Sequence, residues 1–96
     1  MEVRITCINK DGGYHQNPHT AISHYGWLVE NTGETRKMSR IQMVAWMEKG
    51  NHSYVIDRFG SKAYCYVRTN ENGTSFLQTH SNNRDTDNLL ELPECR

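Results

Sequence analysis

The amino-acid sequence predicts a single α+β domain over residues 1–96, in which an antiparallel β-sheet is packed by one principal helix. Three observations support this prediction. Apolar and polar residues alternate with a period of two in several short segments, which is typical of half-buried strands. Only one segment carries both a start signal and a stop signal for a helix. A chain of 96 residues is long enough for one domain core and too short for two.

The first third of the chain predicts two strands, a possible third, and a long loop. Residues 2–9 alternate apolar and polar side chains, and residues 22–30 recover the same strand character. Residues 10–20 form a loop whose length is more typical of a functional segment than of a connection. Gly33 supplies a turn, after which residues 35–37 can return as a short strand. The residues expected on the buried face of the first strand are Val3, Ile5 and Cys7.

One helix is predicted from Ser39 to Lys49. Ser39 can cap the free amides while Gln42, three residues later, completes a capping box. Gly50 supplies the left-handed residue that ends the helix. The apolar stripe expected to face the sheet comprises Met43, Val44 and Met47. Two further apolar residues point away from that stripe, namely Ile41 and Ala45.

The remainder of the chain predicts three more strands and an apolar tail. Residues 53–57, 62–69 and 74–79 have strand patterns, and Gly73 follows an asparagine in the strongest short hairpin signal. Residues 88–93 can pin leucine side chains on the core. The expected order of elements is therefore β-β-(β)-α-β-β-β.

From Met38 to Glu94 the chain resembles a family of small bacterial proteins called domain of unknown function 3892. The resemblance rests on the helix, the hairpin that follows it and the pattern of the tail. The residues that match the family's tail pattern are Leu77, Thr79, Asn88, Leu89, Leu92 and Pro93. Gln78 stands where the family pattern has arginine. The resemblance implies a shared fold, and it implies no activity because none is established for the family.

Charge and hydropathy exclude several classes of function. Eleven basic and eleven acidic residues cancel, so the chain lacks the general positive charge with which proteins coat nucleic acid or anionic membranes. No apolar run is long enough to span a membrane. Residues 36–68 carry a local excess of positive charge, which could attract an anionic partner. The seven basic residues of this middle segment are Arg36, Lys37, Arg40, Lys49, Arg58, Lys62 and Arg68.

Three cysteines, Cys7, Cys65 and Cys95, are spaced widely and include no CxxC motif. Such a set resembles neither a disulfide framework nor a four-ligand zinc site. We therefore expect three reduced thiols and a cytoplasmic protein. Cys7 and Cys65 are expected to be small core residues, and Cys95 is expected to be reactive only through exposure near the chain end.

The long loop and the start of the next strand contain the candidate binding residues. These residues are Tyr14, His15, Asn17, His19 and His24. Imidazoles at such spacing could bind a metal or, when protonated, a phosphate, but the spacing matches no known ligand signature. The sequence therefore predicts no metal site, no cofactor and no catalytic residue. The histidines are either solvated polar residues of a loop or contacts to a ligand or partner, and this segment is the expected recognition site if the domain binds anything specific.

Aromatic residues on the later strands offer an alternative. Tyr64, Tyr66 and Phe76 could stack unpaired bases if they shared an open sheet face, although tyrosines also pack well on sheets without any ligand. Three hypotheses follow. The first is a non-catalytic module that binds a protein, a small anionic partner or another copy of itself. The second is a nucleic-acid-binding module, and the third is a small enzyme dependent on histidine or metal.

Overall fold

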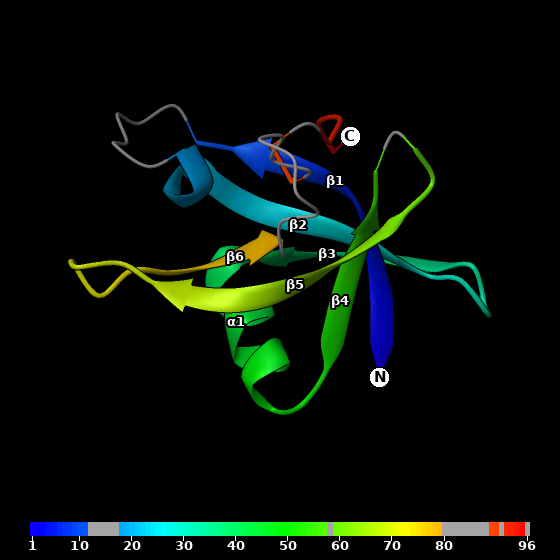
Figure 1. Ribbon diagram of the computed structural model, residues 1–96, viewed down its shortest axis with the longest axis horizontal. Helices are drawn as coiled ribbons and strands as arrows, with labels where there is room; N and C mark the ends of the chain where they lie inside the picture. The colour runs from blue at the N-terminus through cyan, green and yellow to red at the C-terminus, as the bar shows by residue number, and fades with distance from the viewer. Residues whose placement is uncertain (12–17, 58, 80–88, 91, 96) are drawn as a thin grey trace.

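The structure is a computed structural model that describes residues 1–11, 18–57, 59–79, 89–90 and 92–95. Its elements follow the expected order along the chain (Figure 1). They are β1 (Glu2–Lys10), the short 3-10 helix η1 (Pro18–Ala21), β2 (Ile22–Val29), β3 (Glu34–Ser39), α1 (Arg40–Glu48), β4 (His52–Ile56), β5 (Lys62–Thr69) and β6 (Ser75–Thr79).

Six strands form one sheet in the order β3-β2-β1-β4-β5-β6. Neighbouring strands are antiparallel except at the centre, where β1 and β4 are parallel. The expectation of an antiparallel sheet is therefore wrong for this pair. The reason is the connection: α1 carries the chain from the end of β3 back to the level at which β1 begins, so β4 runs in the same direction as β1. A parallel pair requires a crossover of this kind.

The helix begins and ends where its caps predict. The Ser39 hydroxyl accepts a hydrogen bond from the Gln42 amide at 3.2 Å, and the Ser39 amide donates to Gln42 Oε1 at 3.1 Å. This reciprocal capping box satisfies two amides that the first turn leaves without helical partners. Gly50 adopts a φ of 99°, the left-handed conformation that ends the helix. Met43 and Val44 are buried against the sheet, as the stripe predicts.

The core lies between α1 and one face of the sheet, and the sheet curves around it. The buried Tyr25 hydroxyl on β2 accepts a hydrogen bond from the Leu77 amide on β6 at 3.3 Å. Because β2 and β6 are separated in the sheet by three strands, this contact requires strong curvature. Trp27 and Trp46 stack with ring centroids 6.2 Å apart and join the sheet to the helix. We call the sheet face away from α1 the outer face.

A C-terminal segment completes the sheet beside the second half of β1. The Ile8 amide donates to the Pro93 carbonyl, and the Cys95 amide donates to the Ile8 carbonyl, each at 3.0 Å. Ile8 and Glu94 form an isolated parallel bridge, and Leu89 is fully buried. The expectation that the tail pins leucine on the core is confirmed. β1 therefore pairs with β4 along its first half and with this tail along its second.

Within the parts of the chain that the structure describes, none of the helices has both the length and the apolar character needed to cross a membrane.

Candidate functional site

The structure tests the sequence-predicted binding residues only in part. Three of them lie outside the described residues: Tyr14, His15 and Asn17. His19 falls in η1, but its side chain is outside the described part of the chain. His24 lies on β2, and its Nδ1 is 3.0 Å from the Ser23 hydroxyl. Among the described residues, no group of three His, Cys, Asp or Glu side chains could hold a metal ion.

Six side chains on the outer face of the sheet form the best-ordered polar site, which we call the Lys62 cluster. Successive side chains of a strand point to opposite faces of the sheet. The cluster residues on the strands therefore lie on the outer face, because their sequence neighbours, such as Val3, Val55 and Ala63, are buried in the core. Cross-strand pairing then brings the strands' outer residues together, since Tyr54 pairs with Tyr64. The members of the cluster are Glu2 and Arg4 on β1, Glu30 after β2, Tyr54 on β4, and Lys62 and Tyr64 on β5.

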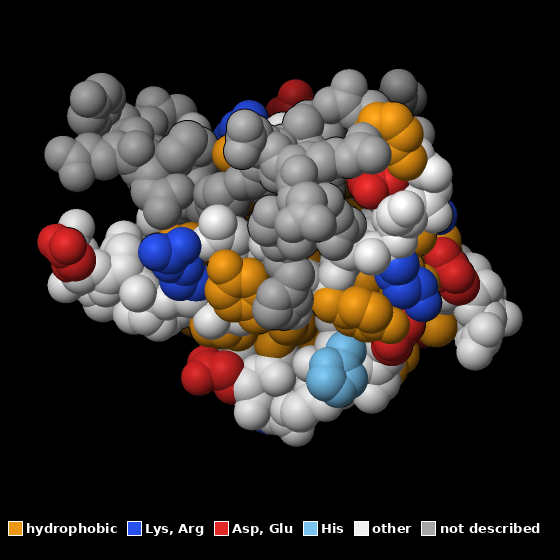
Figure 2. All heavy atoms as spheres, viewed as in Figure 1, with side chains coloured by type: hydrophobic (Ala, Val, Ile, Leu, Met, Phe, Trp, Pro, Cys, Tyr) orange, Lys and Arg blue, Asp and Glu red, His pale blue; other side chains and the backbone are white. Residues whose placement is uncertain are grey.

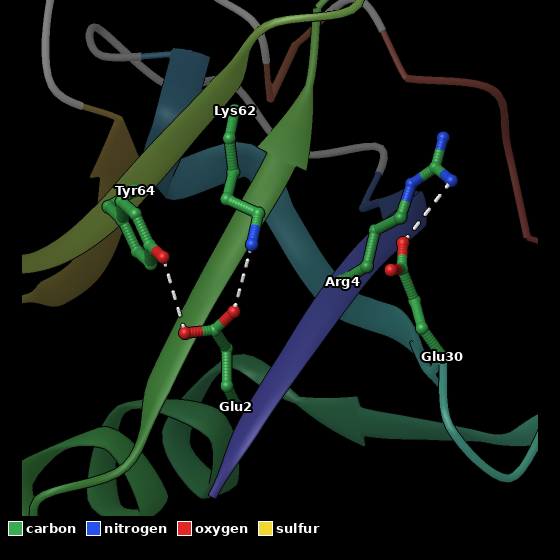
Figure 3. Close-up of polar contacts among 5 residues, drawn as sticks. All are labelled: Glu2, Arg4, Glu30, Lys62 and Tyr64. Carbon is green, nitrogen blue, oxygen red and sulfur yellow. Dashed lines mark hydrogen bonds and ion pairs between the residues drawn. The ribbon is translucent and has the colours of Figure 1, made fainter.

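Lys62 is the centre of this cluster. Its ammonium nitrogen lies 3.1 Å from Glu2 Oε1, 4.2 Å from the centroid of the Tyr54 ring and 5.7 Å from that of Tyr64. The Tyr64 hydroxyl donates to the other Glu2 oxygen at 3.3 Å. Figure 3 shows the side chains of Glu2, Lys62 and Tyr64 pointing toward one another. One carboxylate thus pairs with a cation and accepts a hydrogen bond from a phenol, and the two aromatic rings attract the same cation electrostatically.

Glu2 and Lys62 hold each other in their charged forms. The hydrogen bond from Lys62 lowers the pKa of Glu2, and the same bond raises the pKa of Lys62. Burial and the nearby Glu30 carboxylate raise the pKa of Tyr54. A lysine that stays protonated is neither a nucleophile nor a base. Lys62 therefore serves the cluster as a charged hydrogen-bond donor and not as a nucleophile.

A second ion pair extends the cluster across β1. Arg4 Nη1 lies 3.6 Å from Glu30 Oε1, and the two side chains are 38% and 49% exposed (Figure 3). A pair this exposed contributes only about 0–1 kcal/mol to stability. Its guanidinium and carboxylate groups remain accessible to a partner, so this part of the cluster is better suited to recognition than to stabilisation.

The strand aromatics do not form the open platform that base stacking requires. Tyr64 is 41% exposed, but Phe76 is 1% exposed, and the Lys62 ammonium already covers the ring of Tyr54. Basic residues of the middle segment are engaged as well: Arg36 pairs with Glu34 at 2.8 Å, and Lys62 with Glu2. Figure 2 shows basic and acidic side chains interspersed over this side of the molecule.

Two cysteines are joined, which corrects the expectation of three reduced thiols. Cys7 and Cys95 form a disulfide with their Cα atoms 5.0 Å apart. Cys65 is a buried thiol, as expected. The assignment of Cys7 to the core is also wrong, because a bulge between Ile5 and Cys7 shifts the register of β1. An extra residue reverses the alternation, so Cys7 faces outward and Ile8 faces the core.

Gly26 on β2 makes room for this disulfide. It pairs with Cys7, and a Cβ atom built on it would lie 2.8 Å from Cys95 Sγ and would overlap Cys7 Sγ. A glycine in the middle of a strand often marks a place where another group approaches closely. This glycine was the one signal in the sequence that could have pointed to the disulfide. The signal for the Lys62 cluster was weaker: polar residues alternate with apolar ones in β1 and β5, which places the polar ones on one face of each strand.

Comparison with known proteins gives one match. The family model described as "Protein of unknown function (DUF3892)" matches residues 4–93. Neither a curated protein nor a solved structure matches the chain significantly.

Proposed function

The chain belongs to the DUF3892 family of proteins of unknown function, and from that premise we propose that it is a non-catalytic module that binds a partner protein through the Lys62 cluster. The observation that carries this proposal is the fixed arrangement of Lys62, Glu2 and Tyr64 on the sheet face that α1 leaves uncovered. Tyrosine and arginine are enriched at the energetic centres of protein interfaces, and both occur here. Side chains held in place before binding lose less entropy when a partner arrives.

The charges of the cluster favour a protein over an anionic ligand. Glu2 and Glu30 balance Lys62 and Arg4, and each cation already lies beside a carboxylate. A phosphate or nucleic acid would have to displace these carboxylates and would meet no net positive field. A protein surface that itself carries both signs of charge can pair with the exposed sides of both ion pairs. The module therefore suits a partner with mixed charge and an exposed apolar or aromatic residue to pack on Tyr64.

Three groups that could support catalysis are occupied or buried. Lys62 is protonated and bonded to Glu2, and Cys65 is buried in the core at 8% exposure. Tyr54 is buried beneath Lys62. Nucleophilic catalysis requires an accessible nucleophile beside a base. These three groups do not provide that combination.

Site-specific crosslinking tests the proposal. A photoreactive phenylalanine in place of Tyr64 should capture the partner in cells, whereas the same residue in place of Thr69, exposed at the far end of β5, should not. With the purified partner, Lys62→Glu should weaken binding by about tenfold or more, because it replaces the central cation of the cluster with an acid next to Glu2. Lys49→Glu, an exposed charge reversal at the C-cap of α1, is the matched control and should bind normally. Equal crosslinking from both positions, or unchanged binding by Lys62→Glu, would exclude the Lys62 cluster as the contact.

The histidine-containing loop is proposed as a second contact with the same partner. His24 lies on the outer face of β2, because its neighbour Tyr25 faces the core. His15 and His19 precede it in the sequence. The double change His15→Ala with His19→Ala should weaken binding, and a urea unfolding midpoint equal to that of the parent is the control that the fold is retained. If this double variant binds normally, the contact is confined to the Lys62 cluster.

A further inference from the structure

A disulfide, backbone and side-chain hydrogen bonds and leucine side chains attach the described residues of the C-terminal tail to the fold. Two backbone hydrogen bonds join it to Ile8, and Asn9 Nδ2 donates to the Cys95 carbonyl at 3.1 Å. Leu89 is the only described tail residue among the fully buried side chains of the core. Leu90 and Leu92 are partly buried against the same core. Loss of the disulfide therefore removes a covalent restraint from the tail and leaves its described residues held by these apolar contacts and the hydrogen bonds to β1.

The disulfide lies outside the sealed core of the domain. Cys7 and Cys95 are both half-buried, unlike the buried Cys65. Their sulfurs lie on the outer face over Gly26, outside the core between the sheet and α1. Disulfides that are accessible to solvent exchange with thiols more readily than those sealed in a core.

We propose that Cys7–Cys95 is a thiol–disulfide exchange site whose reduction releases the C-terminal tail from β1. The substrate class is a dithiol reductant, either a small dithiol or a protein with two neighbouring cysteines. One reductant thiolate attacks one sulfur of the disulfide, forming a mixed disulfide, and the other cysteine leaves as a thiolate that takes up a proton. The second reductant thiol then attacks the mixed disulfide and releases the remaining cysteine. Two electrons and two protons pass to the protein, and the reductant becomes a disulfide.

Release of the tail changes the surface of β1. The Ile8 amide and carbonyl lose the partners they have in Pro93 and Cys95. Two unpaired backbone groups on a strand form an edge that can accept an extended peptide. In the oxidised chain the tail covers this edge of β1. In the reduced chain the edge is exposed and can bind an extended peptide. This inference is independent of the Lys62 cluster and does not rest on the proposed function.

Hydrogen exchange of single amides in the full-length chain tests the exchange site. Cys65→Ala serves as the parent so that thiol counts report only this disulfide. Treatment with a dithiol under native conditions should yield two thiols by mass spectrometry. The amides of Ile8 and Cys95 should then exchange at least about tenfold faster, while that of Val55 in the central strand β4 should keep its protection. Reoxidation should restore the original rates.

Three results would overturn the proposal: resistance of the native disulfide to the dithiol, unchanged protection of Ile8 and Cys95 after reduction, and loss of protection at Val55. The last would identify the bond as a global staple of the fold. Cys7→Ser with Cys95→Ser should reproduce the reduced exchange pattern. If that variant does not fold, the chemically reduced parent gives the same measurement.

Discussion

Gly26→Ala should be destabilising only while the Cys7–Cys95 disulfide is present. The added Cβ would overlap Cys7 Sγ and lie 2.8 Å from Cys95 Sγ, closer than van der Waals contact allows. The φ of Gly26 is not in the left-handed region, so alanine fits the backbone without strain. The cost of the substitution therefore comes from the two sulfurs alone.

The structure indicates how much Gly26→Ala should change the free energy of unfolding with the disulfide and without it. With the disulfide intact, overpacking should cost about 1–3 kcal/mol. In the Cys7→Ala, Cys95→Ala background the space is empty, and replacing a mid-strand glycine should stabilise the fold by about 0.5–1 kcal/mol. The coupling between the two changes is then about 1.5–4 kcal/mol while the bond is retained.

Urea unfolding of four proteins measures this coupling. The four are the parent, Gly26→Ala, the double cysteine variant and the triple variant. The fluorescence of Trp27 and Trp46 reports unfolding of each. Thiol counts by mass spectrometry report whether Gly26→Ala still forms the disulfide. An equal cost of Gly26→Ala in both backgrounds, within about 0.5 kcal/mol, would refute the steric explanation.

Three further predictions concern single interactions. Ser39→Ala removes the hydroxyl of the capping box and should lower the free energy of unfolding by about 1 kcal/mol in urea, whereas an unchanged midpoint would argue against the cap. Tyr25→Phe leaves the buried Leu77 amide without its acceptor and should cost about 1–3 kcal/mol by the same assay; a neutral result would show that the curved sheet does not depend on this bond. Lys62→Met should raise the pKa of Glu2 toward that of an ordinary glutamate in a carboxyl NMR titration. Because folding lowers the pKa of Glu2, its contribution to folding stability is present above its unfolded pKa and is lost as the pH falls through the folded pKa. Identical titrations of parent and variant would contradict the ion pair.

The elements that the sequence predicted well are those whose signals are local. Ser39, Gln42 and Gly50 define both ends of α1 within twelve residues, and the capping geometry confirms them. The boundaries of β5, Lys62–Thr69, match the prediction, and burial alternates along the first half of the strand. Each of these signals depends on neighbours along the chain, where propensity and periodicity act directly.

The relations that the sequence did not reveal join distant segments. Alternation in β1 and β4 is the same whether the strands run parallel or antiparallel, so direction could not be inferred from either strand. Glu2 and Lys62 meet across sixty residues, and Cys7 and Cys95 across 88. Pairing of cysteines cannot be deduced from spacing alone. The charge count could identify basic and acidic residues but could not show which of them pair.

One irregularity in β1 explains both the C-terminal tail and the disulfide that holds it. Residues Glu2–Arg4 pair with β4, whereas Ile8 pairs with the tail, and the bulge between Ile5 and Cys7 lies between these two regions. A bulge bends its strand and increases its twist, which allows β4 to diverge and leaves the second half of β1 with an open edge. The same extra residue turns Cys7 from the core to the outer face, where it can meet Cys95. A single inserted residue therefore creates both the edge that the tail occupies and the sulfur that fixes it there.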